Sequence, residues 1–261
     1  MTAAQALATQ GRVIHALMLR EIKARFGRLK LGYFWAFFEP VMFVVILAVI
    51  FNVIGRDSPG GMPLTLFLAT GIMGFIFFRG GFQFTMMSIR QNRALLTFPQ
   101  VTPFELVIAR AALEFVTLFI VFVMLFSAYA FVTNQSIPVE DPLRVFGALI
   151  VMHLIGFGSG VMCSALVIVY PSIQELAGAF ILRPSFFISG VFFTADMMPE
   201  EVRYWALFNP VLHGMETLRS GFFPGFESEY AVPVYPVVFA LVVVFLGFLV
   251  LRAFRARIYQ P

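Results

Sequence analysis

Long apolar stretches, separated by short polar ones, occupy most of the chain. They lie near residues 35–54, 64–84, 106–132, 145–169, 175–193 and 233–251. About 20 helical residues, at a rise of roughly 1.5 Å each, cross the roughly 30 Å hydrocarbon core of a bilayer. Apolar runs such as VVFALVVVFLGFLVL lack the polar alternation of a barrel strand. The pattern predicts an all-α integral membrane protein whose six transmembrane helices form one domain over residues 35–251.

The composition agrees with a membrane protein. Of the 261 residues, 60% are hydrophobic and 12% are charged, whereas about a quarter of the residues in soluble domains are charged. Basic residues gather on one side of the predicted spans: Arg12, Arg20, Lys23, Arg25, Arg28, Lys30, Arg90, Arg93, Arg252, Arg255 and Arg257. That side is predicted to be cytoplasmic, which places residues 1–34 and the tail 252–261 there. The net charge of +4 requires no nucleic acid partner.

The segment before the first span has the pattern of a helix lying in the membrane surface. Its apolar residues recur at helical spacing: Met18, Ile22, Phe26 and Leu29. Arg20 and Lys23 point elsewhere on such a helix. Residues 1–34 are therefore predicted to contain an amphipathic interfacial helix.

Glu39 and Pro40 lie just inside the first apolar stretch. Pro40 can begin or kink a helix there, because the first N–H groups of a helix lack partners. The Glu39 carboxylate either pairs with a local basic residue near the headgroups or faces a water-filled path. The residues alone leave both interpretations open.

Residues 90–103, RQNRALLTFPQVTP, connect the second and third spans on the cytoplasmic side. We expect a short helix over 92–98 that ends at Pro99, and Pro103 is expected to start the next span. Such a helix either offers a stiff contact to another protein or makes a simple interfacial turn. The residues that would make the contact are Arg90, Asn92, Arg93, Leu95, Leu96, Phe98 and Pro99.

The external segment is predicted to contain a re-entrant hairpin over residues 196–223. Pro199 can open one short helix, and Asn209 can cap a second one that starts at Pro210. Both helices are too apolar to sit in water, so the hairpin must be buried against protein. His213 and Glu216 share a face of the second helix but make a poor metal site. A polar cluster of His213, Glu216 and Arg219 that orders the hairpin is expected instead.

Two arginines, Arg79 and Arg183, fall inside predicted spans. A charge there costs about 2.5–3.5 kcal/mol at mid-bilayer, so each must face protein or water. They either pair with Glu39, Glu114 or Glu175 or line a path for an anionic substrate. Aromatic residues near the membrane faces are also ambiguous, because they can anchor the protein in the bilayer or stack on sugar rings. These are Tyr33, Trp35, Tyr204 and Trp205.

Enzymatic signatures are missing. No G-x-x-x-x-G-K-[ST], H-E-x-x-H or G-x-S-x-G motif occurs, so no catalytic residue, metal or cofactor is predicted on this chain. An intramembrane transferase would need a convergent acid, base or nucleophile, and a channel would need a repeated polar stripe. Gly156 and Gly160 form a G-x-x-x-G pair, which allows close helix packing within the chain or at a homodimer seam.

Three segments resemble a known family, the type-2 permeases of ABC exporters. LMLREIKARFGRLKLGYFWAFFEP is similar to the family's entry segment. FFISGVFFTADMMP and FNPVLHGMETLRSGFF look like its fifth-span exit and Asn-Pro re-entrant region. Within the family, the likeness is to the inner-membrane permeases that export capsular polysaccharide in Gram-negative bacteria.

The resemblance implies a homodimer of six-span subunits, each docked to a separate ATPase subunit that holds ATP and Mg. This chain would be a transport subunit without its own ATPase site. Segment 12–30 would gate the channel, 90–103 would couple to the ATPase, and 196–223 would line the exit. Glu39 and Pro40 would join the gating helix to the channel.

Family likeness further implies a lipid-linked, often acidic glycan as the substrate. A periplasmic adaptor and an outer-membrane channel are expected as further partners, and the plasma membrane as the location. Teichoic acid, O-antigen or a small molecule are alternative cargoes within the same fold.

Overall fold

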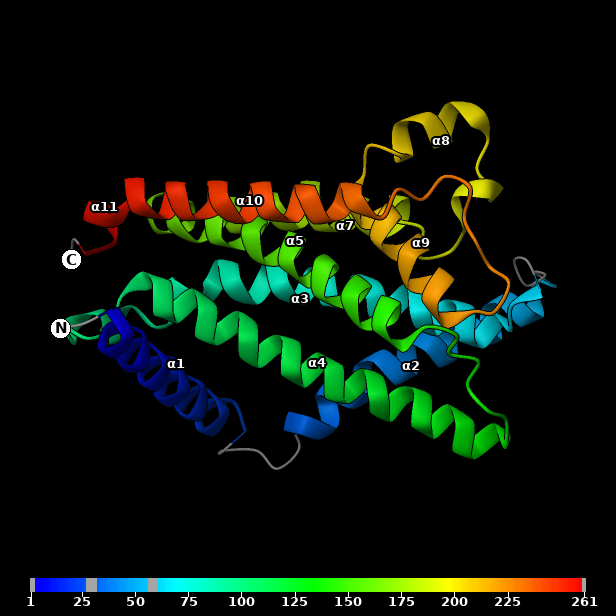
Figure 1. Ribbon diagram of the computed structural model, residues 1–261, viewed down its shortest axis with the longest axis horizontal. Coiled ribbons are helices and arrows are strands. Elements are labelled where there is room, and N and C mark those ends of the chain that lie inside the picture. Colours follow the sequence, from blue (N-terminus) through cyan, green and yellow to red (C-terminus); the bar gives the residue numbers. More distant parts are fainter. Residues whose placement is uncertain (1–2, 27–31, 56–60, 260–261) are drawn as a thin grey trace.

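The computed structural model describes residues 3–26, 32–55 and 61–259, and these residues are helical or irregular without a strand. The longer helices are α1 (Ala3–Phe26), α2 (Gly32–Val53), α3 (Leu64–Gln91), α4 (Pro103–Thr133), α5 (Pro142–Val169) and α10 (Val234–Ala253) (Figure 1). The shorter ones are η2 (Arg93–Thr97), α6 (Ile173–Ala177), η3 (Gly178–Leu182), α7 (Arg183–Ile188), η4 (Ala195–Met197), α8 (Glu200–Ala206), α9 (Pro210–Phe222) and α11 (Arg255–Tyr259). The all-α prediction is confirmed for the described ranges.

Four helices are long and apolar enough to cross a membrane: α3, α4, α5 and α10. Helix α2 adds a shorter apolar segment, Phe37–Val53. It begins at Gly32 and continues through Pro40. Of the two roles predicted for Pro40, starting the helix is therefore wrong, and a position inside the helix, where it can kink it, is the one that fits. Pro40 instead lies inside it, where its missing N–H interrupts the backbone ladder.

The fifth apolar stretch differs from its prediction of one helix over 175–193. Helices α6, η3 and α7 follow one another over residues 173–188, which corresponds to roughly 24 Å of helix. The middle element, η3, is a π-helical turn just before Pro184. Pro184 cannot donate the backbone hydrogen bond that a regular helix needs there. The helix ends at Ile188, and Gly190 then turns the chain with a φ of +74°.

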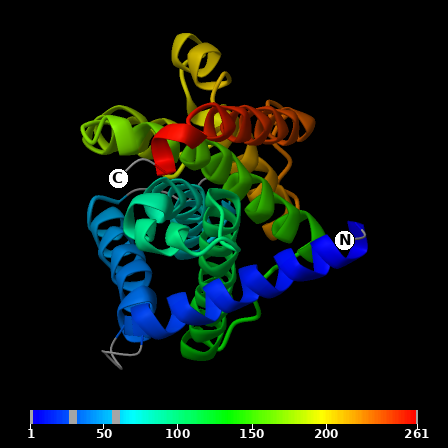
Figure 2. The same ribbon diagram turned by 90° about the vertical axis from the view of Figure 1, so that its left-hand side faces the viewer.

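Helix α3 forms the centre of the bundle. It packs against α2, α4, α5 and α9, and Figure 2, an end view, shows α1 and α10 on the outside of this group. Every side chain from Leu66 to Phe78 is buried, so this half of α3 has no lipid-facing stripe. Helix α10 packs on the side of α5 that faces away from α3.

Glycines bring α3 and α5 into close contact. A Cβ added at Gly156 of α5 would meet the carbonyl of Phe78, and one at Gly160 would meet the carbonyl of Phe82. Gly81 of α3 approaches the α5 backbone in the same way. The G-x-x-x-G pair therefore packs two helices of one chain together, which is the first of the two roles that the sequence left open.

Helix α1 begins, and α11 ends, at the same end of the molecule (Figure 1). Met18 and Ile22 are half-buried while Arg20 and Lys23 are exposed. The side chain of Phe26 and the whole of Leu29 lie outside the described part. At the opposite end, α8 stands away from the bundle and most of its side chains are exposed. Within the described ranges, this helix of the predicted hairpin is therefore not buried against protein, as the sequence had led us to expect.

We predict opposite effects for two alanine substitutions in α5. Gly156→Ala forces a methyl group against the Phe78 carbonyl and should lower the stability by about 1–3 kcal/mol. A methyl group added at Gly147 would meet no atom within 4 Å. Gly147→Ala should therefore leave the stability unchanged or raise it by up to about 1 kcal/mol. Thermal unfolding in detergent measures both. Equal melting temperatures would contradict the close contact.

Candidate functional site

An ion pair joins α2 and α3 at the point where α3 first exposes a charged side chain. Arg79 Nη2 lies 3.2 Å from Glu39 Oε1, and the two side chains are 39% and 54% exposed. Beyond Arg79, Gln83 and Met87 follow at intervals of four residues and also reach the surface. This spacing places the three side chains on one face of α3.

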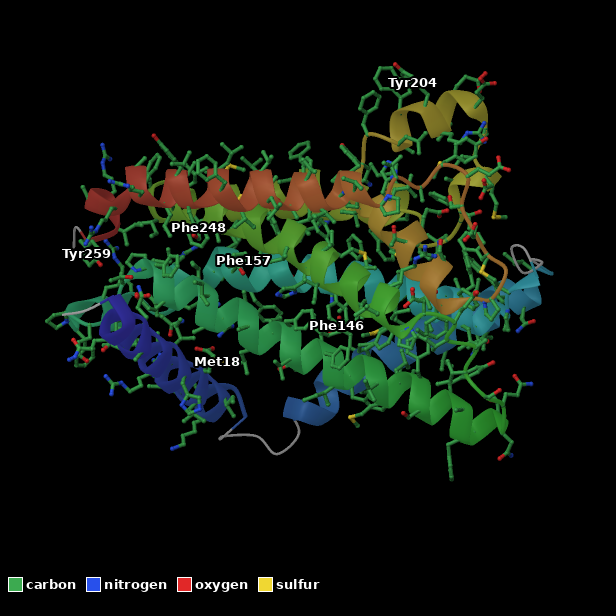
Figure 3. All side chains as sticks on the ribbon, in the orientation of Figure 1. Met18, Phe146, Phe157, Tyr204, Phe248 and Tyr259 are labelled. Atoms are coloured by element: carbon green, nitrogen blue, oxygen red, sulfur yellow. The ribbon has the colours of Figure 1, made fainter. Side chains whose placement is uncertain are left out.

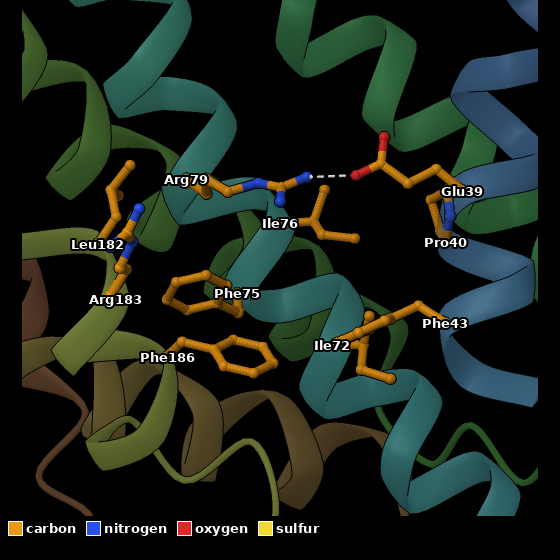
Figure 4. Close-up of a pocket in the computed structure, with 10 residues that line it drawn as sticks. All are labelled: Glu39, Pro40, Phe43, Ile72, Phe75, Ile76, Arg79, Leu182, Arg183 and Phe186. Carbon is orange, nitrogen blue, oxygen red and sulfur yellow. Dashed lines mark hydrogen bonds and ion pairs between the residues drawn. The ribbon is translucent and has the colours of Figure 1, made fainter. Parts of the chain in front are cut away.

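An amphipathic pocket of about 280 Å³ lies on one side of this ion pair (Figure 4). Helices α2, α3, η3 and α7 supply its lining: Glu39, Pro40, Phe43, Ile72, Phe75, Ile76, Arg79, Leu182, Arg183 and Phe186. The charged side chains lie along one edge, while Phe75 and Phe186 form part of the apolar side, with their rings 5.0 Å apart. We call this the aromatic pocket.

A second pocket of about 500 Å³ adjoins it further along α3. Its lining is more polar: Glu39, Pro40, Ile76, Arg79, Gly80, Gln83, Phe84, Met87, Gln91, Glu114, Thr117, Leu118 and Gln174. We call this the glutamine pocket. Because Glu39 and Arg79 line both pockets, their ion pair lies at the boundary between them.

The two arginines that the sequence grouped together, Arg79 and Arg183, differ in their partners. Arg79 has the carboxylate partner described above. Arg183 lines the same aromatic pocket, but within the described ranges its guanidinium makes no hydrogen bond or ion pair. The pocket therefore holds one paired arginine and one without a carboxylate among the described residues.

Two of the four aromatic candidates, Tyr204 and Trp205, do not line these pockets. Tyr204 and Trp205 lie on α8, where they are exposed and contact each other and Phe208. Figure 3 shows Tyr204 pointing away from the bundle. The side chains of Tyr33 and Trp35 lie outside the described part of the structure.

The connection between α3 and α4 contains a short helix within the expected range 92–98, and it is the 3₁₀ helix η2. Leu95 and Leu96 are half-buried, whereas Arg93, Phe98 and Pro99 are exposed. Arg90 donates a hydrogen bond to Gln174 of α6 at 3.2 Å. Helix α4 then begins at Pro103, as predicted.

Helix α1 contacts the residue before η2 and also the helix that follows the connection, α4. Arg20 donates a hydrogen bond to the side chain of Asn92, directly before η2, at 2.8 Å. The next residue, Glu21, forms an ion pair with Arg110 of α4. In the sequence, Arg20 indicated only the membrane orientation and the polar face of this helix, and neither contact was predicted. The adjacent opposite charges of α1 were the only signal, and they name no partner.

Helix α9 is capped as the sequence predicts. The Asn209 side chain accepts a hydrogen bond from the Val211 N–H at 3.0 Å, and Pro210 occupies the first helical position. His213 Nε2 lies 2.8 Å from the Leu207 carbonyl, and the Val232 N–H donates to His213 Nδ1 at 3.1 Å. Both ring nitrogens of His213 are thus engaged with backbone groups.

Arg219 is completely buried and binds the turn that follows α7. Its guanidinium donates hydrogen bonds to the carbonyls of Gly190 at 2.6 Å, Val191 at 3.0 Å and Phe193 at 3.1 Å. It also lies 3.8 Å above the Phe67 ring of α3 and 3.9 Å from the Glu216 carboxylate. Sequence spacing predicted the Glu216 contact but not the carbonyl contacts, which depend on the positive φ of Gly190.

No group of three or more metal-ligating side chains occurs among the described residues. The two pockets offer amide, carboxylate, guanidinium and aromatic groups. Such groups suit the binding of a polar, ring-containing molecule.

A model of the ABC-2 type transporter family matches residues 12–223. The chain belongs to this family. The match includes both pockets, η2, and the hairpin through α9. In this ABC-2 type transporter, α10 and α11 lie beyond the matched residues.

Several relatives are similar to this transporter over nearly its whole length. The polysialic acid transport protein KpsM of Escherichia coli is 29% identical over 94% of this chain and 93% of the relative. The capsule polysaccharide export inner-membrane protein BexB of Haemophilus influenzae is 29% identical over 96% of this chain and 94% of its own. The O-antigen export system permease protein RfbA of Klebsiella pneumoniae is 25% identical over 79% of this chain and 78% of the relative.

We predict that Arg219 is required for stability. Arg219→Met leaves three carbonyls and Glu216 without their buried partner, and should cost about 3–5 kcal/mol. The double variant Arg219→Met with Glu216→Gln should recover part of that loss. Thermal unfolding in detergent measures each variant.

The control is Arg203→Met on α8. Arg203 also lies over an aromatic ring, that of Tyr230, but it does not hold the turn after α7. Its loss should cost about 1 kcal/mol or less. If Arg219→Met melted at the same temperature as this control, the buried arginine would not hold the turn.

Proposed function

We propose that this chain is the membrane-spanning permease subunit of an ATP-driven exporter that moves capsular polysaccharide across the bacterial inner membrane. The observation that carries the proposal is the near full-length similarity to KpsM and BexB, which are named for polysialic acid transport and capsule polysaccharide export. The pockets support it, because glutamine side chains and aromatic rings are groups that bind sugars by hydrogen bonds and stacking.

The proposed topology has six crossings, made by α2, α3, α4, α5, the α6–α7 run and α10. Both termini are cytoplasmic in this proposal, supported by the placement of α1 and α11 at one end of the molecule. The α6–α7 run is short for a full crossing. The turn after Ile188 and the hairpin 196–223 complete it as a re-entrant element. Helix α1 lies in the cytoplasmic membrane surface.

The proposed partners are a separate ATPase subunit that holds ATP and Mg, and a second copy of this chain. The need for the ATPase follows from the missing phosphate-binding loop. A periplasmic adaptor and an outer-membrane channel would carry the glycan onward. No metal or cofactor is proposed for this chain.

In the proposed mechanism, ATP binding moves the ATPase subunits, and the coupling segment 90–103 moves with them. Helix α1 receives this motion through the contacts that Arg20 and Glu21 make with Asn92 and Arg110. Because α1 precedes α2 in the chain, the motion reaches Glu39 and the pockets. No covalent change in the glycan is involved.

The proposed path for the glycan starts at the cytoplasmic end of the bundle. It passes Tyr33 and Trp35 and continues through the glutamine and aromatic pockets, where Arg79 and Arg183 meet anionic groups. The proposed exit lies at the hairpin, with Tyr204 and Trp205 near its outer face.

O-antigen is the second candidate cargo, because RfbA of Klebsiella pneumoniae is similar over most of the chain. The cargo is tested in the native host. Removing the gene for this chain should abolish surface capsular polysaccharide and leave the polymer inside the cell. A host that lost O-antigen and kept its capsule would contradict the capsule proposal and favour this alternative.

We predict that Phe98 contributes to ATPase docking. Phe98 is 59% exposed beside η2, so Phe98→Asp should reduce the amount of co-purifying ATPase subunit at least about tenfold without unfolding the chain. Phe208→Asp is the matched control, because Phe208 is 60% exposed in the segment directly after α8, and α8 stands at the other end of the molecule from the start of α1 (Figure 1).

Purification of tagged chains in mild detergent, followed by mass spectrometry, measures the ATPase bound to each variant. Wild type and Phe208→Asp should carry it in equal amounts. Equal amounts on Phe98→Asp would place the docking surface elsewhere.

A further inference from the structure

We propose that Glu39 and Arg79 form an exchangeable latch between α2 and α3. An anionic group on the transported glycan displaces the Glu39 carboxylate from Arg79 and thereby frees α2 from α3. This inference rests on the proposed export function. It adds a charge requirement for the cargo and a step at which the cargo acts on the transporter.

The Glu39–Arg79 pair lies at the boundary between the two pockets. Glu39 and Arg79 are shared by the aromatic and glutamine pockets, so a glycan that occupied both pockets would pass directly over them. Figure 4 shows the Arg79 side chain reaching across the edge of the aromatic pocket toward Glu39. The pair therefore lies where a cargo must touch it.

The geometry of the contact makes exchange possible. A single nitrogen of Arg79 contacts a single oxygen of Glu39, at 3.2 Å. A guanidinium has five N–H donors and binds a carboxylate or phosphate more strongly through two parallel hydrogen bonds. An anionic group entering from either pocket can use donors of Arg79 that this contact with Glu39 leaves unused.

The exposure of this pair differs from that of the buried ion pair in α9. The Arg79 and Glu39 side chains are 39% and 54% exposed, whereas those of Arg219 and Glu216 are 0% and 1% exposed. An exposed ion pair contributes little to stability, whereas breaking a buried one is strongly destabilising. The Glu39 pair is thus suited to opening and closing, and the Arg219 pair to permanent structure.

Arg183 gives the pocket its preference for an anion. It lines the aromatic pocket with Arg79 and has no carboxylate partner among the described residues. Once Glu39 has left, two guanidinium groups border one pocket, beside the rings of Phe75 and Phe186. The chemistry favours an anionic oxygen group carried on a sugar ring or on an apolar chain.

Pro40 links the exchange to movement. It follows Glu39 inside α2 and lacks the N–H that would hydrogen-bond to the preceding turn. Helices bend at such positions. Release of Glu39 from α3 therefore frees α2 beside the residue where it bends most easily.

The test measures glycan affinity of the chain with its ATPase subunit in lipid nanodiscs. The acidic probe is a short oligogalacturonate, and the neutral probe is a maltooligosaccharide of the same length. Dodecyl phosphate serves as a third probe, so that a sugar carboxylate and a phosphate on an apolar chain are distinguished. Tighter binding of either acidic probe than of the neutral one supports the latch and identifies the source of the anion.

Single substitutions of Glu39 and of Arg79 should shift the affinity for the acidic probe in opposite directions. Glu39→Gln frees Arg79 and should tighten binding of the acidic probe about tenfold, whereas Arg79→Gln should weaken it about tenfold. The double variant should bind like Arg79→Gln. Arg144→Gln, at an exposed position near the start of α5 and outside both pockets and the hairpin, is the control and should bind like wild type. Unchanged affinity in Glu39→Gln, or weaker binding in both single variants, would overturn the latch.

The exchanged pair, Glu39→Arg with Arg79→Glu, separates a latch from a purely structural contact. It retains an ion pair and should melt like wild type, but it moves the guanidinium to α2 and should lose surface polysaccharide. Wild-type export by this variant would overturn the latch while leaving the export function intact. A different result would overturn the export function itself: a wild-type chain that binds no ATPase subunit, in a host whose surface polysaccharide does not depend on the chain.

Discussion

The close contact between α3 and α5 is the constraint on which the bundle depends. Gly156 and Gly160 let the two backbones approach until no side chain fits between them. In lipid, helix association gains little from burying apolar surface, so close packing between small residues is a main source of attraction. This contact keeps α3 in the centre, where α2 and α4 pack on α3, and α10 packs on α5 (Figure 2).

The polar features of the transporter follow from the position of α3. Its first half is buried up to Phe78, and only from Arg79 onward does one face reach the surface. Charged and amide groups are therefore confined to the half of α3 that adjoins η2, where α1 also makes its polar contacts. The proposed cargo site and the proposed coupling segment lie along one continuous part of the bundle.

The sequence predicted features that depend on local residues. The apolar stretches gave the long helices, and the Asn209 cap followed from short-range chemistry. Features that need distant contacts could at most be named as alternatives, as Glu39 was for Arg79. Nothing in the sequence places Glu39 beside Arg79, forty positions away, rather than beside another basic residue, and the carbonyl partners of Arg219 exist only because Gly190 turns the chain.

The central claim is that the face bearing the two pockets lines a water-accessible path. The most direct test places a single cysteine at Gln83, in the glutamine pocket, or at Leu241, exposed on α10, in a chain carrying Cys163→Ala. A charged, membrane-impermeant thiol reagent should label Gln83→Cys rapidly in inverted membrane vesicles and leave Leu241→Cys unlabelled. Equal protection of both cysteines would show that the pocket face is covered by lipid or protein, which would contradict the account.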